Sequence, residues 1–219
     1  MSEQAIKLPD ALRARLAADY APVKPLPAPM TRALWMLPFA ALALLAAQFI
    51  FELRVDAPRL GWGGTWGMSI AQVMVGLVVV AAALREAVPG RAWSGTATRL
   101  WIGLPIVMVV AVTLFSWGAS PVRLRGGWYF VGALCLTGSI VSALPAVLLA
   151  SILAARAYPT RPAVAGALLG LGAGLMADAG WRLFCHFSEP SHVLSAHLGG
   201  VIVSMCLGAA IARRLAPNP

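Results

Sequence analysis

This sequence of 219 residues has few charged side chains: they make up 11% of the chain, whereas 60% of it is hydrophobic. Soluble globular proteins carry about 25% charged residues, so this composition does not suit a water-exposed surface. Three cysteines are too few for a disulfide-rich secreted scaffold, and the glycines lack the triplet period of collagen. The high apolar content also excludes a disordered chain. These absences leave an integral membrane protein of about one domain.

Acidic residues are particularly scarce, with 8 against 17 basic residues and a formal net charge of +9. A basic chain is a candidate for nucleic-acid binding when its charges form a run or patch with interleaved aromatic residues. Here the basic residues lie between apolar segments instead. We therefore predict no direct nucleic-acid binding, and we expect the lysines and arginines to orient the chain in a lipid bilayer and to meet anionic headgroups.

Long apolar stretches are abundant, and six of them are long enough to cross about 30 Å of hydrocarbon as helices. None shows the alternation of apolar and polar residues that is typical of barrel strands. The stretches cover residues 33–51, 66–84, 100–118, 129–155, 163–183 and 193–211. The sequence therefore predicts an all-α fold, an integral membrane bundle of six transmembrane helices preceded by a short cytoplasmic N-terminal helix.

The basic residues also predict the topology. The first 31 residues are polar or mixed, so we expect no cleavable signal peptide. With six spans, twelve basic residues fall on the side of the termini and five on the other side. Loops on the cytoplasmic side of a membrane carry the excess of Lys and Arg. Both termini are therefore predicted to be cytoplasmic in a multi-pass protein.

Three regions follow from this topology: a cytoplasmic head over residues 1–31, a transmembrane domain over residues 32–212 and a cytoplasmic tail over residues 213–219. Residues 22–29 of the head read PVKPLPAP. Prolines at this density favour an extended spacer without internal hydrogen bonds. Such a spacer would hold the start of the head away from the membrane, although the segment also serves simply as the entry to the first span.

The head begins with a short amphipathic pattern. Leu8, Leu12 and Leu16 recur at four-residue spacing, which places them on one face of a helix. A helix of about a dozen residues is marginal alone in water. Its apolar face either docks into a groove on a cytoplasmic partner or lies on the lipid surface, which Arg13 and Arg15 would also suit. The residues alone leave both interpretations open.

The fifth predicted span contains two features of its own. Gly166, Gly170 and Gly174 form a face of small residues, which lets another span, or the same span of a second copy in a homodimer, approach closely. Asp178 and Arg182 are four residues apart with the acid first, the favourable order for an ion pair within a helix. An acidic residue in a span is either part of such a structural pair or carries a proton, an ion or a signal.

Cysteines and histidines gather at the outer side of the predicted bundle. Cys135 lies near the outer end of the fourth span and Cys185 just after the outer end of the fifth, whereas Cys206 is an apolar thiol in the middle of the sixth. Outer thiols can pair or bind soft metals, and imidazoles add nitrogen ligands. The pattern indicates a metal or redox sensor with transient zinc or heavy-metal binding and no required cofactor; polar residues that cap helices are the alternative. The histidines of the chain all follow Cys185: His186, His192 and His197.

Three segments carry a resemblance to a known family. They are LAADYAPVKPL in the head, the cysteine of the fourth span with the following LPAVLLASILAARAYPTRPAVAGALLGLGAGLMA, and CHFSEPSHVLSAHLGG after the fifth span. In their order and layout they resemble the NrsF-like family of six-span bacterial membrane anti-sigma factors, the negative regulators of extracytoplasmic-function sigma factors. The resemblance covers most of the chain.

The resemblance implies a location in the bacterial inner membrane and a partner, an extracytoplasmic-function sigma factor held away from RNA polymerase until an external signal arrives. It implies that metal or oxidative stress acts on Cys135 and Cys185, beside which His186, His192 and His197 lie. The contacts to the sigma factor are expected from the head: Leu8, Leu12, Arg13, Leu16 and Asp19.

Two other functions are compatible with six spans. A small cation or metal transporter would use Asp178 with the histidines, but the spans show no inverted repeat. An intramembrane serine protease would use Ser139 and His197. The segment LTGSIVS lacks the glycine that follows the serine in the rhomboid motif, so we predict that the protein is not an enzyme.

Overall fold

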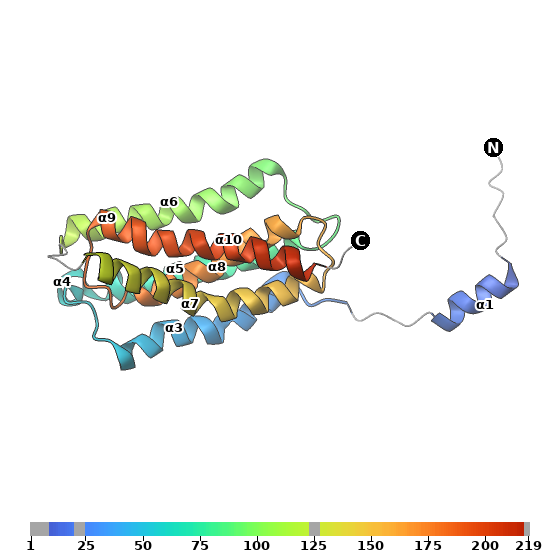
Figure 1. Cartoon of the computed structure of the whole chain (residues 1–219), viewed down its shortest axis with the longest axis horizontal. Helices are drawn as coiled ribbons and strands as arrows, with labels where there is room; N and C mark the ends of the chain where they lie inside the picture. The colour runs from blue at the N-terminus through green and yellow to red at the C-terminus, as the bar shows by residue number, and fades with distance from the viewer. Residues whose placement is uncertain (1–8, 20–24, 123–127, 217–219) are drawn as a thin grey trace.

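The computed structural model describes residues 9–19, 25–122 and 128–216, which fold into helices joined by short loops (Figure 1). This part of the chain contains no strand, so the all-α prediction is confirmed. The helices are α1 (Asp10–Asp19), α2 (Pro29–Ala33), α3 (Leu37–Ile50), α4 (Ala57–Trp62), α5 (Met68–Glu86), α6 (Gly95–Ala119), α7 (Trp128–Ala155), α8 (Pro162–Trp181), α9 (Pro190–His192) and α10 (Gly199–Leu215). Three irregular turns are the 3₁₀ turn η1 (Leu34–Met36) and the π-helical turns η2 (Gly63–Gly67) and η3 (Val193–Leu198).

The number of spans is a correction to the sequence analysis. Five helical segments of the described chain are long and apolar enough to cross a membrane, not six: Ala57–Glu86, Gly95–Ala119, Tyr129–Ala155, Pro162–Trp181 and Pro190–Leu215.

The predicted first span, over residues 33–51, is wrong as one long helix. Its apolar helical stretch, Pro29–Leu45, is shorter than the other five. Pro38 has no N–H to continue the helical ladder, and a 3₁₀ turn precedes it. Helix α2 leads through this turn directly into α3, which has 14 residues and runs along the bundle away from the end at which the chain enters (Figure 1). It still packs on the bundle, because a Cβ on Gly180 of α8 would overlap the backbone carbonyl of Ala43.

Helix α8 forms the centre of the bundle, and every residue from Ala165 to Gly180 except Ala167 is buried. Its glycine face packs against α10 of the same chain: a Cβ added at Gly170 would overlap the Ser204 carbonyl, and one at Gly166 would overlap the Gly208 carbonyl. Small residues thus allow two backbones to touch, as predicted. The face that the sequence left open for a second copy is therefore filled within one chain.

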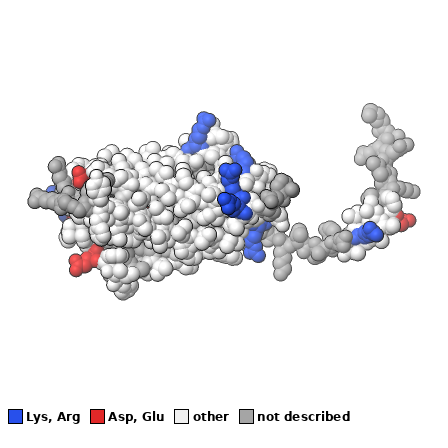
Figure 2. Space-filling view, viewed as in Figure 1, with Lys and Arg blue, Asp and Glu red and all other residues white. Residues whose placement is uncertain are grey.

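The two ends of the bundle differ in charge. Figure 1 shows α9 and the C-terminus at opposite ends, and Figure 2 shows basic side chains gathered at the end near the C-terminus and, on the face in view, acidic side chains at the other end of the bundle. Arg85 lies in the last turn of α5, and Arg213 and Arg214 lie in the last turn of α10. This asymmetry has the form that the positive-inside rule describes.

Candidate functional site

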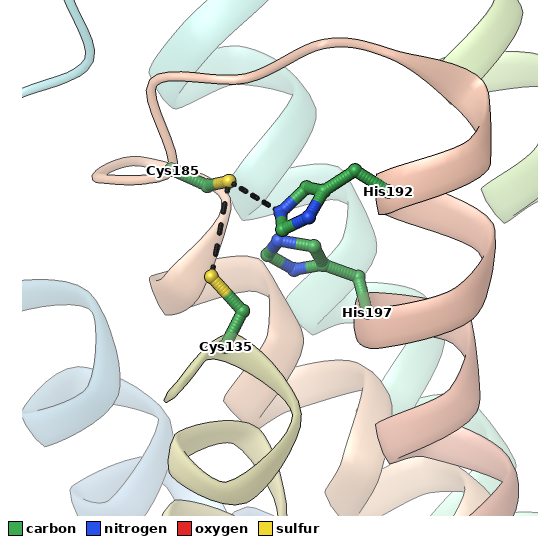
Figure 3. Close-up of side chains that lie close together, drawn as sticks. All are labelled: Cys135, Cys185, His192 and His197. Carbon is green, nitrogen blue, oxygen red and sulfur yellow. Dashed lines mark hydrogen bonds between the residues drawn. The ribbon is translucent and has the colours of Figure 1, made fainter. Parts of the chain in front are cut away.

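Four cysteine and histidine side chains meet at the bundle end that holds α9 (Figure 3). Cys135 comes from α7, Cys185 from the loop after α8, His192 from α9 and His197 from η3. One potential ligand atom from each of the four lies within 4.8 Å of the others. The Sγ atoms of Cys135 and Cys185 are 4.0 Å apart, and the Sγ of Cys185 is 3.2 Å from Nε2 of His192. Residues 62 positions apart in the sequence are thus brought into one cluster.

The cluster is buried, and both histidines are fully inaccessible at 0% exposure. Buried polar atoms normally have hydrogen-bond partners. Among the described residues, Nδ1 of His192 and Nε2 of His197 have none. Nε2 of His197 is thus free for another ligand, whereas His192 faces Cys185 with its other ring nitrogen, Nε2. We call Cys135, Cys185, His192 and His197 the Cys/His cluster.

Asp178 of α8 contacts the Cys/His cluster through His197. Its Oδ1 is 2.8 Å from Nδ1 of His197, and its Oδ2 accepts hydrogen bonds from Nε of Arg182 at 2.9 Å and from Nε2 of Gln72 at 2.8 Å. The ion pair between Asp178 and Arg182 that the sequence predicts is therefore present. The carboxylate is fully buried, so its charge requires these partners.

A cavity gives access to the two cysteines. It has a volume of about 410 Å³, reaches Cys135 and Cys185, and is lined mainly by apolar side chains that include Phe51, Trp181 and Phe184. Glu52 and His186 also line it. A small molecule or ion can therefore approach the sulfur atoms without unfolding the bundle.

The thiol of Cys185 is activated by its surroundings. A hydrogen bond from the Cys135 thiol holds the pKa of Cys185 well below its ordinary value, against the opposing effect of burial, and His197 and His192 lower it further. A lowered pKa favours the thiolate, which is the form that reacts with oxidants and binds metals. Cys185 is therefore the more reactive partner of the pair.

This activation predicts a change with Cys135→Ala in a protein that already carries Cys206→Ser. Loss of the thiol donor is expected to raise the pKa of Cys185. The thiolate should then form only at a higher pH than it does with Cys135 intact. Ultraviolet thiolate absorbance of the metal-free, reduced protein, recorded against pH, measures this. Identical titration curves with and without Cys135 would contradict the assignment.

The remaining residues predicted for the sensor and the head lie elsewhere. His186 lies outside the Cys/His cluster, and its Nδ1 accepts a hydrogen bond from the backbone N–H of Val55. In the head, Leu12, Arg13 and Leu16 are exposed on α1, which ends at Asp19, while Leu8 lies outside the described residues. Figure 1 shows α1 apart from the bundle.

The residues proposed for a serine protease are not bonded to one another. The Oγ of Ser139 and Nε2 of His197 are both buried, and neither has a hydrogen-bond partner in the described parts of the chain. A nucleophilic serine requires a base within hydrogen-bond reach. The geometry gives no support to a Ser139–His197 dyad.

Sequence analysis missed Gln72 and Thr113, which complete the polar network around Asp178. Gln72 binds the carboxylate, and Nη2 of Arg182 donates to Oγ1 of Thr113 at 3.1 Å. Gln72 is the kind of residue that a sequence can flag, because an amide in an apolar span needs a buried partner. Its partner, however, is 106 residues away.

Comparison with known proteins gives one relationship. Neither the curated proteins nor the solved structures contain a match to this chain. The family model NrsF, described as negative regulator of sigma F, matches residues 16–216. The match covers the whole bundle, the Cys/His cluster and the head from Leu16 onward, as the sequence resemblance implied. With most of its length matched, the chain belongs to the NrsF family of negative regulators of a sigma factor.

Proposed function

We propose that this protein is a membrane-bound anti-sigma factor that sequesters an extracytoplasmic-function sigma factor through its cytoplasmic head and releases it on a periplasmic metal or oxidative signal. The observation that carries the proposal is the buried Cys/His cluster at the bundle end opposite the basic one. Two thiols and two imidazoles are ligands for soft metals, and adjacent thiols can be oxidised. Membership of a family of sigma-factor regulators indicates that the signal acts on a sigma factor.

The orientation of the bundle supports a location in the bacterial inner membrane. Figure 1 shows the chain entering the bundle through α2 and α3 at the same end at which α10 leaves it. This end carries most of the basic side chains of the bundle (Figure 2). In the proposal it faces the cytoplasm together with the head and the tail, and the Cys/His cluster faces the periplasm.

The head provides the surface for the sigma factor. Leu12 and Leu16 are one helical turn apart on α1 and are 43% and 55% exposed. An exposed apolar pair on a short helix suits docking into a groove, where the partner also stabilises the helix. Arg13, which is exposed on the same helix, and Asp19, at its last position, would set the orientation of this pair by charge.

The signal needs to change the free-energy difference between the holding and releasing states by only a modest amount. A switch between holding and releasing states shifts by one to two orders of magnitude when a ligand favours one state by about 1.4 to 2.8 kcal/mol. Metal binding or oxidation at Cys135 and Cys185 would pull α7 toward the loop after α8. Because α8 contacts α3, α5, α7 and α10, a small shift there reaches most of the bundle.

The test is retention of the sigma factor by the purified protein. The double variant Leu12→Ala/Leu16→Ala is expected to bind the sigma factor at least about tenfold more weakly, because buried apolar anchors dominate such interfaces. Leu26→Ala is the matched control: Leu26 is also exposed, but lies in the proline-rich spacer. The protein is first isolated from native membranes, and mass spectrometry identifies the sigma factor bound to it. The affinity of each variant for that sigma factor is then measured.

Two results would overturn the proposal. Equal retention by the double variant and the wild type would remove the head as the binding surface. If the intact, abundant full chain retained no sigma factor and the purified protein instead carried zinc into vesicles, the transporter would be supported.

A further inference from the structure

We propose that the Cys/His cluster is a closed Cys₂His₂ site for one divalent d¹⁰ cation, of which zinc is the reference member, and that Asp178 is the positioning residue that presents His197 to it. This deepens the proposed function, since it names the ligand class and the regulation of the sensory site. The site combines two sulfur and two nitrogen ligands, the donor set typical of tetrahedral zinc.

The donors fit such a cation in chemistry and in burial. All four side chains are buried, and their ligand atoms already lie within 4.8 Å of one another. Nε2 of His197 is buried without a hydrogen-bond partner among the described residues, and Nε2 of His192 faces the Sγ of Cys185 at 3.2 Å. A buried imidazole nitrogen without a partner is costly unless it binds a ligand. Soft thiolates beside it select zinc and its heavier relatives over magnesium or calcium.

Asp178 sets which nitrogen of His197 is free. A carboxylate accepts hydrogen bonds, so the 2.8 Å contact of Asp178 places the proton of His197 on Nδ1. In the neutral imidazole, Nε2 then keeps its lone pair. Metal-binding histidines in proteins donate a hydrogen bond from the N–H of their other ring nitrogen to a carboxylate in this way, which fixes the ring and raises its basicity. Asp178 contacts His197 and is not one of the four candidate ligand residues, so its role is positional.

The same carboxylate ties the cluster to two further helices. Gln72 of α5 donates both to Asp178 at 2.8 Å and to the backbone carbonyl of Leu175 at 3.0 Å. Arg182 donates to Asp178 and to Thr113 of α6. A cation that draws His197 toward the sulfurs therefore pulls on a buried polar chain that joins α8 to α5 and α6. This chain is a defined route from the outer site into the bundle.

The experiment measures metal binding alone, with the full chain purified in detergent and kept reduced. Zinc affinity is determined by competition with a chromophoric chelator, and cobalt(II) is added to report a tetrahedral thiolate site by its visible absorption. The wild type is expected to bind one zinc ion per chain. Cys185→Ser should lose the thiolate band, while Asp178→Asn should keep the site but bind zinc about 10- to 100-fold more weakly, as such partners typically do.

Glu189→Gln is the matched control. It removes the same charge close to His192, in the loop before α9, and is expected to change zinc affinity less than about twofold, far below the 10–100-fold expected of a second-sphere partner. Each variant is compared only as a monodisperse species. If Asp178→Asn does not fold, ¹⁵N-histidine spectra of the metal-free wild type decide the point: His197 should show the tautomer protonated at Nδ1.

The outcomes separate this site from the proposed function. Failure of the reduced wild type to bind zinc would remove the metal site, even if the sigma factor is retained. Unchanged zinc affinity in folded Asp178→Asn, or a His197 tautomer protonated at Nε2, would remove the role of Asp178. Zinc binding with the expected loss in Asp178→Asn, but without any retained sigma factor, would leave the site standing and overturn the proposed function.

Discussion

Replacing either Cys135 or Cys185 with serine is expected to abolish signal-dependent release of the sigma factor. A serine hydroxyl is a hard, neutral oxygen donor that does not replace a thiolate on a soft metal and cannot form a disulfide. The two sulfurs are 4.0 Å apart, so each depends on the other for metal binding and for oxidation. Induction of about ten- to hundredfold by zinc or by a thiol oxidant should fall to background.

The measurement is transcription from a promoter that depends on the sigma factor, with membrane levels of each variant checked by immunoblot. Cys206→Ser is the matched control, because Cys206 is exposed on α10 and outside the Cys/His cluster. It should respond like the wild type. Normal induction in both Cys135→Ser and Cys185→Ser would remove the sensing role, whereas constant release in either variant would mean that the serine locks the released state.

The cluster itself was largely predictable from the sequence. Cys135 and Cys185 were placed at the outer ends of two spans by length alone, and the histidines follow Cys185 closely. Span ends on one side of a membrane meet in one plane, so the helical layout brings such residues near one another. The sequence does not specify helix rotation, however. Rotation of α9 and η3 decides that His192 and His197 face the sulfurs, whereas His186 lies in the loop after α8 and bonds to Val55.

The hydrogen bonds of Asp178 to residues of other helices were not predictable, because the sequence does not specify helix rotation. Asp178 was paired with Arg182, its neighbour within the helix, because local spacing is all that a sequence shows. Its contacts with His197 and Gln72 span 19 and 106 residues. They depend on how α8 lies against α5 and η3, which is set by close backbone packing at glycines such as Gly76 and Gly172.

The first span shows the limit of counting apolar residues. Residues 33–51 have the composition of a membrane helix, but a 3₁₀ turn followed by Pro38 interrupts the regular helix, and the apolar helical stretch Pro29–Leu45 is shorter than the five spans. Hydropathy measures transfer into lipid and does not register a missing N–H. By contrast, the sequence correctly predicts that the glycine face of the fifth span is a packing surface. It does not decide whether another span or a second copy packs on this face.

That packing surface leads to the largest expected effect on stability, in Gly170→Leu. A Cβ at position 170 would overlap the Ser204 carbonyl of α10, which is backbone and cannot rotate away. The two helices must separate, and overpacking of this kind costs typically 1 to 3 kcal/mol or more, so we expect a loss of at least about 2 kcal/mol in the free energy of unfolding.

Gly103→Leu on α6 isolates the packing contribution, because a Cβ there meets nothing within 4 Å. Replacing glycine favours the helix by about 1 kcal/mol at either position, so the difference between the two variants reports the contact between α8 and α10. Thermal unfolding in detergent, followed by circular dichroism, should show Gly170→Leu far less stable and Gly103→Leu equal to or above the wild type. Equal stability of the two variants would mean that α10 does not lie against this face, and that the glycines remain free to bind a second copy.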